Sequence, residues 1–149
     1  MSTYQQHTLE GASPVELVVA LYDGIVRFLY SAIAAVEAGD AHARRSAVKR
    51  ALDILIHLQA RLRMDIGGRP AEVLSEFYAS VFALILQASQ ASSAERFEEV
   101  IGYIRNVRDA WRQVSIETSR SSGNGNLLLP RRAGASQQSD AGQASSWTA

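Results

Sequence analysis

The chain has 149 residues, no cysteine, and 15 basic against 15 acidic residues, so its formal net charge is zero. This length suits one domain, and the lack of cysteine excludes disulfides and thiolate metal sites. The balanced charge offers no bulk attraction to nucleic acid or to an anionic membrane. Because we find neither an apolar run near the ~18 residues that span a bilayer nor the pattern of a secretory signal, we expect a cytoplasmic protein without membrane insertion.

Residues 1–12 precede the first clear helical signal. They are polar with isolated apolar residues, Tyr4 and Leu9, and show no sustained period. We therefore expect an N-terminal arm outside the folded core. Its two apolar residues allow two interpretations: a frayed terminus, or an arm that packs over an apolar groove of the domain.

The first predicted helix has a specific start. Residues 13–16, Ser-Pro-Val-Glu, place an N-cap serine before a proline at the first helical position and a glutamate at the third, which is a capping box. The helix is predicted to run to about residue 38 and to end at Gly39, a residue suited to the left-handed cap. Its apolar seam, with spacings of three and four, consists of Val15, Val18, Tyr22, Ile25, Leu29 and Val36.

Two further helices follow, at about residues 41–66 and 70–91. Asp40 can cap the first of them, and Gly67-Gly68 separates them. The seam of the earlier helix is Val48, Leu52, Leu55, Leu62 and Ile66, with Gln59 as a polar exception, and that of the later helix is Leu74, Phe77, Val81, Leu84 and Ala88.

A second capping box at residues 92–95, Ser-Ser-Ala-Glu, predicts a fourth helix at about 94–119. Its seam is Phe97, Val100, Ile104, Val107, Trp111 and Val114. Short connections make neighbouring helices antiparallel, so we predict an all-α fold, an antiparallel up-down-up-down four-helix bundle over residues 13–120. Residues 121–149 are dominated by Ser, Gly, Asn, Gln and Ala, which predicts a disordered C-terminal tail.

The sequence offers little chemistry. Its histidines, His7, His42 and His57, lack ligand spacing, the Glu-x-x-His motif of di-iron bundles is absent, and no phosphate-binding glycine loop is present. We therefore expect no catalytic residue, cofactor or metal site, and a protein that works by binding another protein. A phosphotransfer bundle that uses His57 remains as an alternative.

Some large apolar residues lie off the predicted seams. They are Leu17, Leu21 and Phe28 in the first helix, Ile54 and Leu58 beside Ala47 and Ala51 in the second, and Phe82 and Leu86 in the third. One interpretation is a wide buried helix face, and the other is a groove for a partner helix. The small alanines favour the groove. A third possibility is that these residues close a dimer, so the free protein is expected to be a monomer or a weak dimer.

The chain resembles the FliS family of flagellar chaperones in the order and spacing of several motifs. These are Tyr4-Gln5-Gln6, Glu10-Gly11-Ala12-Ser13-Pro14, Leu21-Tyr22-Asp23-Gly24, Gly39-Asp40, Asp65-Ile66-Gly67-Gly68, Leu74, Tyr78, Glu99-Val100 and Arg108-Asp109-Ala110-Trp111. The match covers about residues 4–116. It departs at Val73 and Ser80, where the family tends to have Asn and Tyr.

The resemblance implies a cytoplasmic export chaperone that binds the C-terminal segment of flagellin, prevents premature polymerisation and delivers the subunit to the gate of the flagellar type III export apparatus. A disordered client that folds on binding can cover a large apolar surface and still be released. The family also implies that the arm can occupy part of the site. The candidate partner-binding residues are Tyr4, Leu9, Leu17, Leu21, Tyr22, Phe28, Ala47, Ala51, Ile54, Leu58 and Phe82.

Overall fold

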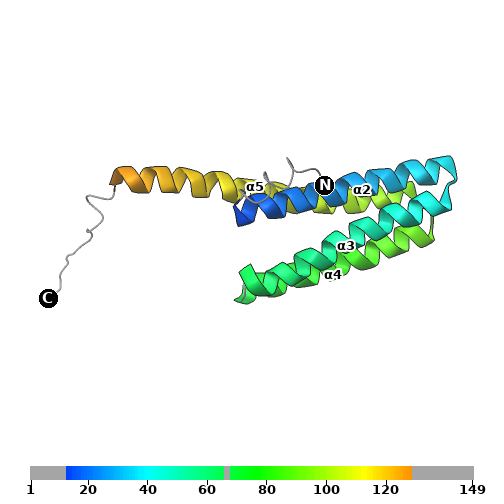
Figure 1. Ribbon diagram of the computed structural model, residues 1–149, viewed down its shortest axis with the longest axis horizontal. Coiled ribbons are helices and arrows are strands. Elements are labelled where there is room, and N and C mark those ends of the chain that lie inside the picture. Colours follow the sequence, from blue (N-terminus) through cyan, green and yellow to red (C-terminus); the bar gives the residue numbers. More distant parts are fainter. Residues whose placement is uncertain (1–12, 66–67, 129–149) are drawn as a thin grey trace, which may run out of the picture. The chain divides into compact units, whose positions relative to one another are not determined.

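The computed structural model describes residues 13–65 and 68–128, and within these ranges it contains four α-helices and no strand. The helices are α2 (Pro14–Ala38), α3 (Ala41–Asp65), α4 (Gly68–Gln90) and α5 (Ala94–Leu128). The chain divides into two compact units, which are residues 1–112 and residues 113–149. In the first unit, α3 packs against both α2 and α4, and successive helices run in opposite directions (Figure 1). The predicted all-α four-helix bundle is confirmed.

The predicted start and end of α2 are confirmed in atomic detail. The Glu16 backbone N–H donates to Ser13 Oγ at 3.1 Å, and the Ser13 N–H donates to Glu16 Oε1 at 3.0 Å, so the capping box is complete. Gly39 ends the helix with φ of 69°, in the left-handed region that favours glycine.

The start of α5 differs from the prediction. Ser93, and not Ser92, caps the helix, because its Oγ accepts a hydrogen bond of 3.1 Å from the Arg96 N–H. Glu95 therefore lies one position too early to complete a capping box. Ser92 instead adopts a left-handed backbone conformation, with φ of 48°, in the turn before the helix.

One arginine joins the turn between α4 and α5 to the start of α3. Arg44 donates from Nε to Ser89 Oγ at 3.1 Å and from Nη1 to Ser92 Oγ at 2.9 Å. The side chain of Ser89 is itself buried. Arg44 therefore crosslinks the end of the bundle that holds the α2–α3 and α4–α5 turns.

The core of the bundle draws on all four helices. Its large, almost fully buried side chains are Tyr22, Ile25, Leu29, Leu58, Val81, Ile85, Phe97, Val100 and Ile104. The predicted seam of α4 is partly wrong, because Tyr78 and Ile85 are buried whereas Phe77 and Leu84 are only half-buried. Apolar residues occupy several faces of α4, so their spacing alone did not fix which face turns inward. Val114, also expected in a seam, is exposed.

Helix α5 is longer than predicted. It continues to Leu128, whereas the sequence analysis ended it at about residue 119 and assigned residues 121–128 to a disordered tail. The physical reason is that no proline interrupts this stretch before Pro130, which disfavours helical backbone at the residue preceding it. The rest of the predicted tail, residues 129–149, lies outside the described residues, as does the predicted arm.

Within residues 13–65 and 68–128, two helices are long and apolar enough to cross a membrane by length and composition alone. These are α2, with a mean hydropathy of 1.6 over its best window, and α4, with 1.3. The sequence analysis overlooked them because charged residues interrupt their apolar runs. Core helices of soluble bundles reach the same values, and both helices bury side chains in the core of this one.

Candidate partner-binding site

Four of the candidate partner-binding residues belong to the core. Tyr22, Ala47, Ala51 and Leu58 are all buried, and Leu58 is only 1% exposed. The interpretation of Ala47, Ala51 and Leu58 as an open stripe is wrong. Because α3 packs between α2 and α4, its buried face is wider than one seam, and these residues fill that extra width.

Ile54 lies at the contact between α2 and α3. A Cβ atom placed on Gly24 would lie 3.1 Å from Ile54 Cδ1, so the glycine allows the two helices to approach closely. Ile54 is half-buried and packs against the core. This contact explains Gly24 without any role in partner binding.

The remaining candidates in the described residues are half-buried. Leu17, Leu21, Phe28 and Phe82 all retain some exposed surface. The Arg50 guanidinium lies 5.7 Å from the ring centre of Phe28, a cation–π arrangement. Tyr4 and Leu9 lie outside the described residues.

Part of the exposed apolar surface of α3 and α4 lies in a groove between the two helices. We call it the α3–α4 groove; its apolar half has a volume of about 200 Å³ and is lined by Leu55, Ile56, Gln59, Tyr78, Ala79 and Phe82. Ile56 is the most exposed large apolar residue of the described bundle, at 57%. A second hollow of about 430 Å³ continues from Gln59 and is lined by Leu62, Ala71, Glu72, Ser75 and Glu76.

Only Phe82 of this groove was among the candidates. The sequence contained a usable signal, because Leu52, Ile56 and Gln59 follow spacings of four and three along α3. The stronger stripe through Ala51, Ile54 and Leu58 hid this signal, and the fold buries Ala51 and Leu58 and half-buries Ile54. Side chains two positions apart on a helix point in very different directions. A prediction that is wrong by two positions therefore assigns a buried residue to the exposed surface, and an exposed residue to the core.

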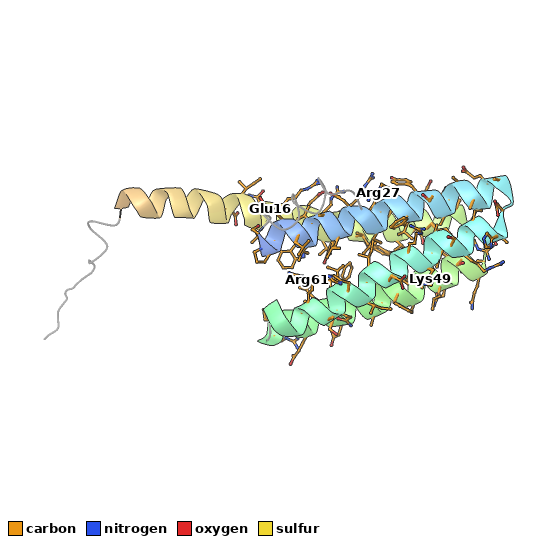
Figure 2. The ribbon with its side chains drawn as sticks, in the orientation of Figure 1. Glu16, Arg27, Lys49 and Arg61 are labelled. Carbon is orange, nitrogen blue, oxygen red and sulfur yellow. The ribbon has the colours of Figure 1, made fainter. Side chains whose placement is uncertain are left out.

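A third hollow, which we call the end pocket, lies where α2 begins and α3 approaches its end. Its volume is about 160 Å³, and its lining consists of Pro14, Val15, Val18, Leu58, Arg61, Leu62, Tyr78 and Trp111. Figure 2 shows Arg61 extending from α3 toward the start of α2. Tyr78 lines both the end pocket and the α3–α4 groove.

Two tyrosines and a tryptophan form a buried polar network beside the end pocket. The hydroxyl groups of Tyr22 and Tyr78 lie 2.7 Å apart, and Trp111 Nε1–H donates to the Tyr22 hydroxyl at 3.2 Å. Burial raises the pKa of both phenols above their usual value, although hydrogen bonds from Tyr78 and Trp111 lower the pKa of Tyr22 in part. Both tyrosines therefore remain neutral at physiological pH and serve as hydrogen-bonding groups within the core.

Asp23 follows Tyr22 in the Leu-Tyr-Asp-Gly motif of residues 21–24 and connects α2 to α5. Arg108 donates to its Oδ1 at 2.9 Å, and Arg112 donates to its Oδ2 at 3.2 Å. The Leu-Tyr-Asp-Gly motif thus supplies three helix contacts: a hydrogen bond to α4 and α5, an ion pair to α5, and a close approach to α3. Its partners in α5 are Arg108, Trp111 and Arg112. The first two belong to the Arg-Asp-Ala-Trp motif at residues 108–111.

The described residues contain no group of three or more His, Asp, Glu or Cys side chains that could hold a metal ion. His42 and His57 are both exposed.

Comparison with known proteins identifies the family of the chain. A family model described as flagellar protein FliS matches residues 1–118. The chain belongs to the FliS family. It is 35% identical over 124 residues to the flagellar secretion chaperone FliS of Salmonella typhimurium, across 80% of this chain and 92% of the relative.

Two other relatives carry the same description, flagellar secretion chaperone FliS. The protein of Campylobacter jejuni is 34% identical over 113 residues, across 76% of this chain and 88% of its own length. That of Bacillus subtilis is 28% identical over 124 residues, across 83% and 91%. The family match includes the motif residues of α2 and α5 that the structure joins, and it ends at residue 118, before the last turns of α5.

Proposed function

We propose that this chain is a flagellar secretion chaperone that binds the C-terminal segment of flagellin in the cytoplasm. Binding would keep the segment from polymerising before export, and the complex would deliver flagellin to the gate of the type III export apparatus. Membership of the FliS family and the secretion-chaperone description of its curated relatives support the proposal.

The α3–α4 groove is the observation that carries the proposal. Ile56 exposes more than half of its surface beside the half-buried Phe82, and Leu86 is also exposed four residues after Phe82. Exposed apolar surface that adjoins a groove is typical of sites that take an amphipathic helix. The groove follows α4 from about residue 82 to 71, which is roughly 16 Å at 1.5 Å per residue, or three turns of a bound helix.

Binding of a peptide that spans the flagellin C-terminus tests the proposal. Calorimetric titration of the wild-type chain should give a defined affinity, and Ile56→Gln should weaken it about tenfold while leaving the melting temperature almost unchanged. Val73→Gln is the matched control, because Val73 is another exposed apolar residue, 48% exposed, that lies on α4 outside the lining of the groove. Absence of binding to the wild type would refute the proposal.

The same titration separates the alternatives. If the groove closed a homodimer, light scattering would give twice the chain mass without peptide, and Ile56→Gln would halve it. A phosphotransfer role would require an acid-labile phosphate on the exposed His57, and His57→Gln would then abolish activity but not peptide binding. The chaperone proposal expects a monomer or weak dimer that forms a one-to-one complex, unaffected by His57→Gln.

A further inference from the structure

Positive charge is concentrated at the start of α3, although the whole chain is neutral. Residues 41–50 contain Arg44, Arg45, Lys49 and Arg50 and no acidic residue. Arg44 donates to the turn between α4 and α5, whereas the other three side chains are exposed. The first turns of α3 therefore present a cationic surface to the solvent.

The carboxylates of the bundle neutralise this surface only in part. Lys49 forms an ion pair with Asp53 at 3.0 Å. In the described part of the chain, no Asp or Glu forms an ion pair with Arg45 or Arg50. The Arg50 guanidinium instead lies over the ring of Phe28, 5.7 Å from its centre, and a cation–π contact leaves the positive charge in place. Two arginines are thus available to a carboxylate from another chain.

A fourth hollow, which we call the α2–α3 groove, adjoins this surface. It has a volume of about 300 Å³ and is lined by Phe28, Ser31, His42, Ala43, Ser46, Ala47 and Arg50. Its buried and half-buried members are Phe28 and the two alanines, and its exposed members are polar. The groove therefore combines an apolar floor with a polar rim that carries a cation and no acidic residue.

This combination restricts the kind of partner. A nucleic acid is held mainly by many contacts to its phosphates, and an anionic membrane is recognised by clusters of about four to eight basic residues. Arg45 and Arg50 supply too few cations for either, and neither partner uses an apolar floor between two helices. An amphipathic helix that carries carboxylates beside an aliphatic side chain is complementary to both the rim and the floor.

We infer that the α2–α3 groove is a second docking surface, which receives an acidic amphipathic helix with an aliphatic side chain against Ala43 and Ala47 and carboxylates beside Arg45 and Arg50. The lining of α3 extends over residues 42–50, which is roughly 12 Å at 1.5 Å per residue, or two turns of a bound helix. Because α3 packs between α2 and α4, this groove and the α3–α4 groove lie on different flanks of α3. The acidic partner would therefore bind beside a client and not in its place.

The probe for this surface is a fluorescein-labelled synthetic helix of about 15 residues with leucines and glutamates on one face, and fluorescence anisotropy measures its affinity for the full chain. Replacement of its glutamates by glutamine should weaken binding about tenfold, and Arg50→Gln should weaken binding of the acidic probe about threefold, as expected for exposed charge pairs. Arg96→Gln removes an exposed arginine from α5 and should leave the affinity unchanged. Melting temperatures should be almost equal in all three proteins.

A charge exchange identifies the contact. Arg50→Glu should repel the acidic probe, and in a set of probes that each carry one lysine in place of a glutamate, one should bind Arg50→Glu more tightly than the original probe does. If no member of the set restores binding, or if the wild type does not bind the acidic probe, the inference is wrong. Equal losses in Arg50→Gln and Arg96→Gln would also overturn it.

Two competitions exclude the other occupants. Vesicles rich in phosphatidylserine and single-stranded DNA should bind far more weakly than the probe; comparable binding that Arg50→Gln reduces would show a general anion-binding surface and overturn the inference. Excess flagellin C-terminal peptide should not release the probe, and release would place both ligands in one site. The direct titration contains no flagellin, so a failure of the proposed function leaves its result unaffected.

Discussion

The hydroxyl groups of Tyr22 and Tyr78 meet at 2.7 Å inside the bundle, although 56 residues separate them in the chain. Tyr22 also accepts from Trp111, so one phenol connects α2, α4 and α5. The aromatic rings of the two tyrosines add an edge-to-face contact, with centres 6.1 Å apart. This polar junction in an apolar core defines one wall of the end pocket and has measurable energetic consequences.

The two tyrosines should respond unequally to the loss of their hydroxyl group. Tyr22→Phe leaves both Tyr78 and Trp111 without their bond and should lower the free energy of unfolding by about 1–3 kcal/mol. Tyr78→Phe preserves the bond from Trp111 to Tyr22 and should cost about 1 kcal/mol. Urea denaturation of both single variants and of the double variant measures these losses. If the loss in the double variant equalled the sum of the two single losses, the two hydroxyl groups would not share a bond.

The raised pKa values of the same tyrosines predict a loss of stability in alkali. Above the ordinary phenol value of 10.0, the unfolded chain releases protons that the folded chain retains. The unfolded state then binds fewer protons, so the free energy of unfolding falls as pH rises and is unaffected by these groups at lower pH. Urea midpoints between pH 8 and 11 should drop above about pH 10. In Tyr78→Phe, the urea midpoint should fall less steeply with pH than in the wild type. An equally steep fall in the two proteins would contradict this account.

Two helical glycines should differ when replaced by alanine. A Cβ on Gly102 meets nothing within 4 Å, so Gly102→Ala should raise the free energy of unfolding by about 0.5–1 kcal/mol through helix propensity alone. Gly24→Ala should raise the free energy of unfolding by less than Gly102→Ala does, or should lower it, because the new Cβ would lie 3.1 Å from Ile54 Cδ1. Combining Gly24→Ala with Ile54→Val should recover the gain in stability, and thermal melts of these three variants would show whether the contact is responsible.

Position on α3 should decide the cost of truncating an apolar side chain. Leu58→Ala opens a cavity in the core and should cost about 2–5 kcal/mol, whereas Ile56→Ala removes an exposed side chain and should cost about 0.5 kcal/mol or less. Peptide affinity should follow the reverse order once each variant is compared in its folded form. Similar melting temperatures for the two variants would contradict the assigned faces of the helix.

Removal of residues 1–12 should leave the melting temperature of the bundle almost unchanged and should accelerate association with the flagellin peptide. An arm that covers the site lowers the binding-competent fraction, and its loss removes that cost. Stopped-flow mixing measures the rate. An unaltered rate with unaltered affinity would mean that Tyr4 and Leu9 take no part in binding.

The sequence predicted helices best where their ends carry a specific chemical signal. The Ser13 capping box and Gly39 placed both ends of α2 correctly, because each residue satisfies a local hydrogen-bonding or backbone requirement. The far end of α5 was misplaced, because the helix continues through Gly123 and Gly125, residues that often end helices, as far as Leu128.

The groove was harder to predict than the helices, because burial depends on how many neighbours a helix has. Leu58 and Ile56 are both apolar and lie on one helix, yet one is in the core and the other is exposed. Only the packing of α3 between two helices distinguishes them. Likewise, the pairing of Asp23 with Arg108 joins residues 85 positions apart, and no local pattern encodes that contact.

The hydrogen bonds from Arg44 to Ser89 and Ser92 stabilise one end of the bundle, whereas the end pocket lies near the other end. Local opening should therefore begin around the pocket, where fewer packed atoms oppose it, and amide protons near Ser89 should exchange with solvent more slowly than those near Arg61. Such a gradient would make the end of the bundle at the end pocket the first to open and the end at the Arg44 crosslink the last.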